Sequence, residues 1–121
     1  NIENNPFTVR SGDVVTNPNL YFSRPTVQIS GFTGNLKVTV GPTSMTIKDI
    51  ANEDTFIDST RYITYSKVGY TITNKNNNTS GKEFFKLEPG NDLRYNRVTF
   101  AATKGSTPTS LTIIPNWRVL V

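Results

Sequence analysis

Residues 26–40 read T-V-Q-I-S-G-F-T-G-N-L-K-V-T-V, a pattern that indicates the class of fold. Its apolar side chains recur at every second position, at Val27 and Ile29 and again from Leu36 to Val40. A period of two places these side chains on one face of a β-strand. Gly31 to Gly34 supplies a four-residue connection, so we expect the two halves to pair as a hairpin.

The same alternation continues on both sides of this stretch, and helical periodicity is nearly absent. Short apolar segments follow one another at roughly the 8–12-residue spacing of a sandwich, which gives about nine or ten short strands. The sequence therefore predicts an all-β fold, an antiparallel β-sandwich. The expected core consists of apolar residues that mostly recur two apart: Val27, Ile29, Leu36, Val38, Val40, Ile47, Ile63, Ile72, Phe85, Leu87, Val98, Phe100, Leu111 and Ile113.

The middle of the chain carries a weaker pattern. Residues 51–60 are predicted to form a polar loop, with room for the one short helical turn of the chain. Residues 62–65 and 70–73 resemble a hairpin that turns around residues 67–69. Residues 74–81 have no apolar side chain, so we expect an exposed tip there.

Near the end of the chain, Pro115 stands between two apolar segments. Because proline cannot donate to a ladder of hydrogen bonds, we expect the chain to change sheet or to bulge at this residue. Trp117 should then lie at a corner, with one edge of its indole in water.

The length and composition fit a single domain. The 121 residues, of 13.5 kDa, allow one domain that spans residues 1–121. Only 35% of the residues are hydrophobic, and Thr and Asn, which suit half-exposed strands and turns, make up the difference. The start at Asn1 rather than Met favours a processed export product or a domain excised from a longer chain, with renumbering as the other alternative.

The composition also excludes several kinds of chemistry. The sequence has no Cys and no His, which excludes thiolate nucleophiles, disulfides, imidazole bases and the usual zinc sites. The net charge of +4 comes from basic residues that are scattered singly, so nucleic-acid binding is not expected. No apolar run approaches the roughly 18 residues of a membrane-spanning helix.

The second half of the chain carries a family resemblance. Residues 85–114 read F-K-L-E-P-G-N-D-L-R-Y-N-R-V-T-F-A-A-T-K-G-S-T-P-T-S-L-T-I-I, in which an apolar strand runs into Pro-Gly, an alternating strand, a hairpin and a last apolar strand. With V-Q-I-S-G-F at residues 27–32 and L-K-V-T-V at residues 36–40, this resembles immunoglobulin-like modules of exported bacterial surface proteins and phage structural proteins.

The resemblance covers most of the chain outside residues 51–80. A weaker similarity, to fibronectin type III domains, rests on residues 87–90 and Tyr95. The resemblance implies an immunoglobulin-like antiparallel β-sandwich that serves as a stalk, a spacer, a decoration or a ligand-binding unit, because these motifs mark strands and turns rather than an active site.

The acidic residues give no sign of catalysis. Residues 52–54, Asn-Glu-Asp, with Asp58 are raw material for a calcium site, but they lack the Gly and the terminal Glu of the twelve-residue calcium loop. The simpler interpretation is a solvated loop with turn-forming side chains. Asp92 beside Glu88 most simply supports a turn. We therefore expect no metal, no cofactor and no hydrolytic or redox activity.

Aromatic residues offer a possible sugar-binding platform. The candidates are Tyr62, Tyr65, Tyr70 and Trp117, with Tyr95 as a further one. Tyr62 and Tyr65 differ by an odd number, so in an unbroken strand they point to opposite faces, one to the core and one to solvent. Ordinary cross-strand packing is the alternative explanation for these rings.

The chain ends offer strands for assembly. Residues 1–6 are polar and should form an extended arm, whereas the last residues are apolar and have no polar tail to cover them. An uncapped apolar edge can pair with a neighbouring subunit, although the last strand can equally close its own sheet. The candidate assembly residues are Phe7, Val9, Val119, Leu120 and Val121.

Two functions follow from these observations. The leading hypothesis is a non-catalytic structural subunit or module of an extracellular assembly, on a cell surface or virion, that contacts copies of itself or neighbouring modules. Surface filaments, adhesin stalks and virion decorations are the forms considered. The alternative is a carbohydrate-binding module that uses the exposed aromatic residues. Asn77 and Asn78 are overlapping acceptors for N-glycosylation, which matters only after eukaryotic or archaeal secretion.

Overall fold

A computed structural model describes residues 5–81 and 83–117 of the chain, and these residues form ten β-strands with two short helical turns. In chain order the elements are β1 (Phe7–Val9), β2 (Thr26–Ile29), β3 (Thr33–Val40), β4 (Thr43–Ala51), β5 (Asp54–Asp58), β6 (Ile63–Val68), β7 (Thr71–Asn74), η1 (Asn76–Asn78), β8 (Thr79–Ser80), α1 (Leu93–Asn96), β9 (Val98–Lys104) and β10 (Leu111–Ile114).

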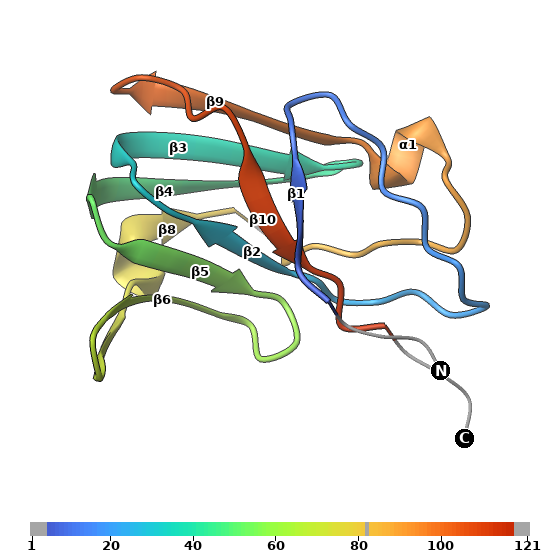
Figure 1. The fold of residues 1–121 in the computed structure, drawn as a ribbon, viewed down its shortest axis with the longest axis horizontal. Coiled ribbons are helices and arrows are strands. Elements are labelled where there is room, and N and C mark those ends of the chain that lie inside the picture. The colour runs from blue at the N-terminus through green and yellow to red at the C-terminus, as the bar shows by residue number, and fades with distance from the viewer. Residues whose placement is uncertain (1–4, 82, 118–121) are drawn as a thin grey trace.

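The strands form two antiparallel sheets. One has six strands in the order β1-β10-β2-β5-β6-β7, and the other has four in the order β8-β4-β3-β9. Figure 1 shows β3, β4 and β9 side by side in one layer, with β10, β2, β5 and β6 in the other. The all-β sandwich of about ten strands is thus confirmed.

The core lies between the two sheets and consists largely of the predicted residues. Phe100, for example, is only 5% exposed, so the register expected for its strand is correct. The predicted core residues that are buried are Val27, Ile29, Leu36, Val38, Val40, Ile47, Phe85, Leu87, Val98, Phe100, Leu111 and Ile113.

The hairpin predicted from residues 26–40 is wrong. β2 pairs with β10 and β5, whereas β3 pairs with β4 and β9 in the facing sheet. The connection between them therefore crosses the sandwich, and Phe32 in this connection is buried. Alternation shows which face of each strand is apolar, but it does not show which strand is the partner. Two strands with apolar faces can lie side by side in one sheet or face each other across the core.

The polar loop predicted for residues 51–60 is also wrong, because β5 occupies Asp54–Asp58 and lies between β2 and β6. Ile57 and Thr55 point into the core, and Asp58 and Ser59 are buried as well. The strand was not predicted because two of its buried side chains are polar and give no apolar alternation. The short α-helical turn lies instead at Leu93–Asn96.

The predicted hairpin in residues 62–73 is confirmed as β6 and β7, but its turn is Gly69–Tyr70 rather than residues 67–69, because Lys67 and Val68 still pair with Ile72 and Thr71. Ile72, however, was wrongly assigned to the core and is 63% exposed, while Ile63 is half-buried. β7 is the last strand of the wider sheet, and all four of its residues are exposed.

The asparagine-rich segment 74–81 is not a simple exposed tip. It carries η1 and β8, and β8 pairs with β4, so this segment takes the chain from the six-stranded to the four-stranded sheet. Lys75, Asn78 and Thr79 are half-buried. Polar side chains suffice here because η1 and β8 need backbone hydrogen bonds rather than an apolar face.

The end of the described chain turns away after β10. Pro115 directly follows the last paired residue, Ile114, and Asn116 has a φ of 53°. The Asn116 side-chain amide donates to the carbonyl oxygen of Arg24 at 3.1 Å and to the Thr26 hydroxyl at 3.0 Å. Trp117 is half-buried and packs against the core.

Candidate functional site

A group of alternating cations and aromatic rings gathers where the chain enters β2. The Arg24 guanidinium carbon lies 5.6 Å from the ring centre of Phe22 and 5.2 Å from that of Tyr62. The Lys86 ammonium lies 4.6 Å from the ring centre of Phe22. Tyr62 in turn meets Phe84 edge to face, with ring centres 5.7 Å apart. Such contacts hold cations at fixed places on a protein surface.

The segment from Phe84 to Glu88 is held by its inward side chains. Phe85 and Leu87 are buried in the core, whereas Lys86 is exposed and Phe84, which also packs against the core, is half-buried like Glu88. Two backbone hydrogen bonds join Leu87 to Ser23, at 2.9 and 3.0 Å.

A further bond anchors the same segment from the other side. The Phe85 amide donates to the Ser59 hydroxyl at 3.0 Å. Core packing and these bonds together fix where Phe84 and Lys86 stand beside Tyr62 and Arg24.

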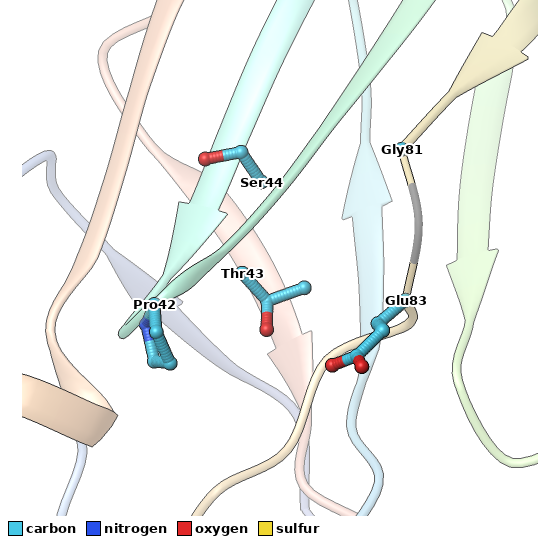
Figure 2. Close-up of a pocket in the computed structure, with 5 residues that line it drawn as sticks. All are labelled: Pro42, Thr43, Ser44, Gly81 and Glu83. Carbon is cyan, nitrogen blue, oxygen red and sulfur yellow. The ribbon is translucent and has the colours of Figure 1, made fainter.

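These residues line an open hollow of about 480 Å³, which we call the Tyr62 furrow: Arg24, Tyr62, Glu83, Phe84 and Lys86. Glu83 also lines a neighbouring hollow of about 400 Å³ with Pro42, Thr43, Ser44 and Gly81. Figure 2 shows this second hollow, with Glu83 facing Thr43 across it.

The charges of the furrow are not neutralised within the described part of the chain. Among residues 5–81 and 83–117, neither Arg24 nor Lys86 forms an ion pair. The Glu83 carboxylate forms no ion pair and accepts no hydrogen bond from these residues. Arg24 is only half exposed, yet its guanidinium N–H groups find no protein acceptor there. The site can therefore supply hydrogen-bond donors to an anion and aromatic faces to a ring.

A second surface feature is the outer edge of β7. In the described residues, no hydrogen bond from another segment reaches the backbone of Thr71–Asn74 on the side away from β6. Ile72 and Val68 are 63% and 61% exposed, and Tyr70 is fully exposed at the turn. β7 contains no charged residue and no proline, which are the usual protections of an edge strand.

The opposite sheet protects its edge strand β9. Gly12 donates to the Val98 carbonyl at 2.7 Å, and Val98 donates to the Asp13 carbonyl at 2.8 Å. The Ser11 hydroxyl accepts from the Phe100 amide at 3.0 Å. The edge of β9 is therefore covered by the segment that follows β1, whereas the edge of β7 has no such cover in the described residues.

The four aromatic candidates are dispersed. Tyr62 lies in the furrow, and Tyr65 stacks on Phe56 of β5 with ring centres 5.0 Å apart. Tyr70 forms part of the β6–β7 turn, and Trp117 lines a hollow beside β1.

Tyr62 differs from the sequence expectation in its backbone. Its φ is 56°, so it does not belong to a regular strand and the odd-number argument does not apply to it. Tyr95 is 40% exposed and borders the hollow next to Glu88. Sequence reasoning missed Arg24, Phe84 and Lys86, because no local pattern joins them to Tyr62.

Of the candidate assembly residues, Phe7 and Val9 lie on β1, an edge strand of the six-stranded sheet. Val9 is buried and Phe7 is half-buried, so both side chains already serve the core of their own domain. Val119, Leu120 and Val121 lie outside the described residues, as does most of the predicted arm.

Two acidic residues near β5, Asp58 and Glu53, have protein partners. Asp58 accepts from the Thr60 hydroxyl at 2.6 Å and from the Arg61 guanidinium at 2.8 Å. Burial alone would raise the pKa of Asp58, but these hydrogen bonds outweigh it and lower the pKa below its ordinary value. Glu53 pairs with Lys75 at 3.3 Å. No group of three potential metal ligands occurs in the part of the chain that the structure describes.

The candidate glycosylation residues Asn77 and Asn78 lie in η1, where Asn77 is exposed. The half-buried Asn78 donates to the Lys48 carbonyl at 3.3 Å. No helix in the described residues is long and apolar enough to cross a membrane.

Comparison with known proteins adds no relative. No family model, no curated protein and no solved structure matches the chain. Function is therefore inferred from the furrow and the β7 edge.

Proposed function

We propose that this protein is a non-catalytic structural module of an extracellular assembly, and that copies of it join through the edge of the six-stranded sheet. The observation that carries the proposal is the open edge of β7, with Ile72 63% exposed in the middle of the strand. The proposal includes an immunoglobulin-like type of sandwich, and a place on a cell surface or in a virion.

The geometry of the β6–β7 hairpin supports strand addition at Ile72. Val68 and Thr71 pair across a two-residue turn, and Lys67 pairs with Ile72 next along the ladder. In an antiparallel pair, hydrogen-bonded and non-hydrogen-bonded positions alternate, so Ile72 directs its N–H and C=O groups away from β6. A neighbouring strand can accept a hydrogen bond from the Ile72 N–H, donate one to its C=O, and cover the Ile72 side chain at the same time.

The test is the mass of the protein in solution, measured by sedimentation over a wide range of concentrations. We expect the mass to rise with concentration. Ile72→Lys should weaken this association by about tenfold or more, because a lysine at an edge strand opposes pairing. Leu20→Lys is the matched control, since Leu20 is 89% exposed and lies outside β7.

Leu20→Lys should associate like the wild type. A wild-type protein that stays monomeric at all concentrations would overturn the proposal. Equal weakening by the two substitutions would also overturn it, because the effect would then come from charge alone.

Carbohydrate binding is retained as the second candidate function because one observation favours it. Tyr62 is 55% exposed and stands beside Arg24 and Glu83, which have no ionic partner in the described residues. The support comes from this single ring with its charged neighbours, and not from a platform of several rings.

A further inference from the structure

We propose that the Tyr62 furrow binds an acidic saccharide, that is, a chain of sugar rings that carry carboxylates. In this site Arg24 holds a carboxylate, Tyr62 stacks on a sugar ring, and Glu83 accepts hydrogen bonds from hydroxyl groups. The proposal does not depend on the assembly function, because none of these residues lies on β7.

Arg24 is the reason to expect an anion. Its guanidinium is fixed between the rings of Phe22 and Tyr62, at 5.6 and 5.2 Å from their centres. Ring contacts leave the N–H groups at the rim of the guanidinium available, and no carboxylate of the described chain takes them. A planar guanidinium held in this way is suited to bind a carboxylate through two parallel hydrogen bonds.

Lys86 adds a second positive charge beside Phe22, with its ammonium 4.6 Å from the centre of that ring. Two cations therefore contact the same aromatic ring, and neither has an ionic partner in the described residues. A ligand with carboxylates at regular intervals matches this spacing of charge better than a single small anion does.

Tyr62 is the reason to expect a ring. Arg24 lies over the Tyr62 ring and Phe84 meets it at a right angle, yet the side chain is still 55% exposed, so much of the ring is accessible to a ligand. The apolar face of a sugar can pack on such an aromatic face while its hydroxyl groups stay polar. An acidic peptide would satisfy Arg24 but would bring no ring to Tyr62.

Glu83 and its neighbours are the reason to expect hydroxyl groups. The Glu83 carboxylate borders the Tyr62 furrow and the hollow of Figure 2, where Thr43 and Ser44 add further polar groups. A carboxylate acts only as an acceptor at neutral pH, so it suits the hydroxyl groups of a sugar. The adjoining hollows leave room for more than one sugar unit.

The experiment titrates the whole 121-residue chain with hexagalacturonate, with binding measured by calorimetry and by amide NMR shifts. We expect saturable binding that weakens with added salt, and shifts centred on residues 22–24, 61–62 and 83–86. The same hexamer with its carboxylates methyl-esterified has the same rings without the charge. It should bind at least about tenfold more weakly, because a hydrogen bond to a charged group is lost.

Three variants test the assigned roles. Arg24→Gln should weaken binding by about tenfold or more, and Arg24→Lys should restore only part of the affinity because lysine lacks the fork. Tyr62→Asn removes the ring while keeping a residue that tolerates the φ of 56°. Arg10→Gln is the matched control, since Arg10 is exposed and does not line the furrow.

The outcomes separate the alternatives. Absence of binding, equal binding of the esterified hexamer, or equal loss in Arg10→Gln would each overturn the proposal. Hexaglutamate that binds as tightly through the same residues would assign the furrow to acidic peptides instead. Each variant is first shown to give the wild-type NMR pattern away from the substitution, so that a loss of binding is not a loss of fold.

Discussion

The side-chain amide of Asn96 donates a hydrogen bond of 3.0 Å to the carbonyl oxygen of Val15, which lies 81 positions earlier in the chain. The same amide donates to the carbonyl oxygens of Glu88, at 2.7 Å, and Gly90, at 2.9 Å. Its carbonyl oxygen accepts from the Glu88 amide at 2.9 Å. Asn96 is fully buried, so its side chain supplies hydrogen-bond partners to backbone groups in two loops, one at Val15 and one at residues 88–90.

Asn96→Ala should therefore destabilise the domain strongly. The substitution leaves several backbone groups without this partner, and each buried unsatisfied group costs about 1–3 kcal/mol. We expect a loss of about 3 kcal/mol or more in the free energy of unfolding, measured by urea denaturation. Asn91→Ala, at an exposed position in the same connection, should change it by less than about 0.5 kcal/mol. Similar losses in both variants would contradict the role of Asn96.

Phe100 and Ile72 offer a direct test of the core. Phe100 is 5% exposed and Ile72 is 63% exposed, although both belong to alternating segments. Phe100→Ala should cost about 3–5 kcal/mol of stability through lost burial and a cavity. Ile72→Ala should cost less than about 0.5 kcal/mol when measured on dilute monomer. The assignment of β7 outside the core would fail if the Ile72 variant lost stability like a core variant.

We expect the domain to lose stability in acid as the Asp58 carboxylate becomes protonated. Its pKa in the folded state is lowered from about 3.8, because hydrogen bonds from Thr60 and Arg61 outweigh the effect of burial. Because the pKa is lowered by folding, the ionised Asp58 carboxylate stabilises the fold fully at pH values above its pKa in the unfolded state. This stabilisation is lost as the pH falls through the pKa in the folded state. The melting temperature of wild type should exceed that of Asp58→Asn at pH 7, and the difference should shrink below about pH 4.

Arg61→Gln removes one of the two partners and should remove part of the same acid-sensitive stability. Melting curves recorded between pH 7 and pH 2 provide the measurement. A difference between wild type and Asp58→Asn that stays constant over this range would show that the ionised carboxylate contributes nothing.

Gly41 and Gly69 form a matched pair, because both have a φ of 59°. A Cβ atom at Gly41 would collide with the backbone of Tyr95, whereas a Cβ atom at Gly69 would meet nothing within 4 Å. Gly69→Ala should cost about 1 kcal/mol for its left-handed backbone, and Gly41→Ala should cost about 1–3 kcal/mol more. Equal costs in thermal or urea unfolding would show that the turn at Gly41 moves freely away from Tyr95.

The class of fold, most of the core and one hairpin could be predicted from the amino-acid sequence. Alternation is a local property of the backbone, because successive side chains of a strand point to opposite faces wherever the strand lies. Val27, Ile29 and Phe100 could therefore be assigned to the core without knowledge of their neighbours. The β6–β7 hairpin was predictable for the same reason, since both strands and the turn at Gly69 are adjacent in the chain.

Strand pairing, open sheet edges and contacts between charged residues could be seen only in the folded chain. Strands pair through backbone groups that do not depend on the side chain. Alternation of side chains therefore could not show that β2 pairs with β5 and β10 rather than with β3. Exposure of Ile72 depends on where the facing sheet ends, and not on the alternation around it. Arg24, Tyr62 and Lys86 come together only because Leu87 pairs with Ser23 and Phe85 fills the core, contacts between segments that are distant along the chain.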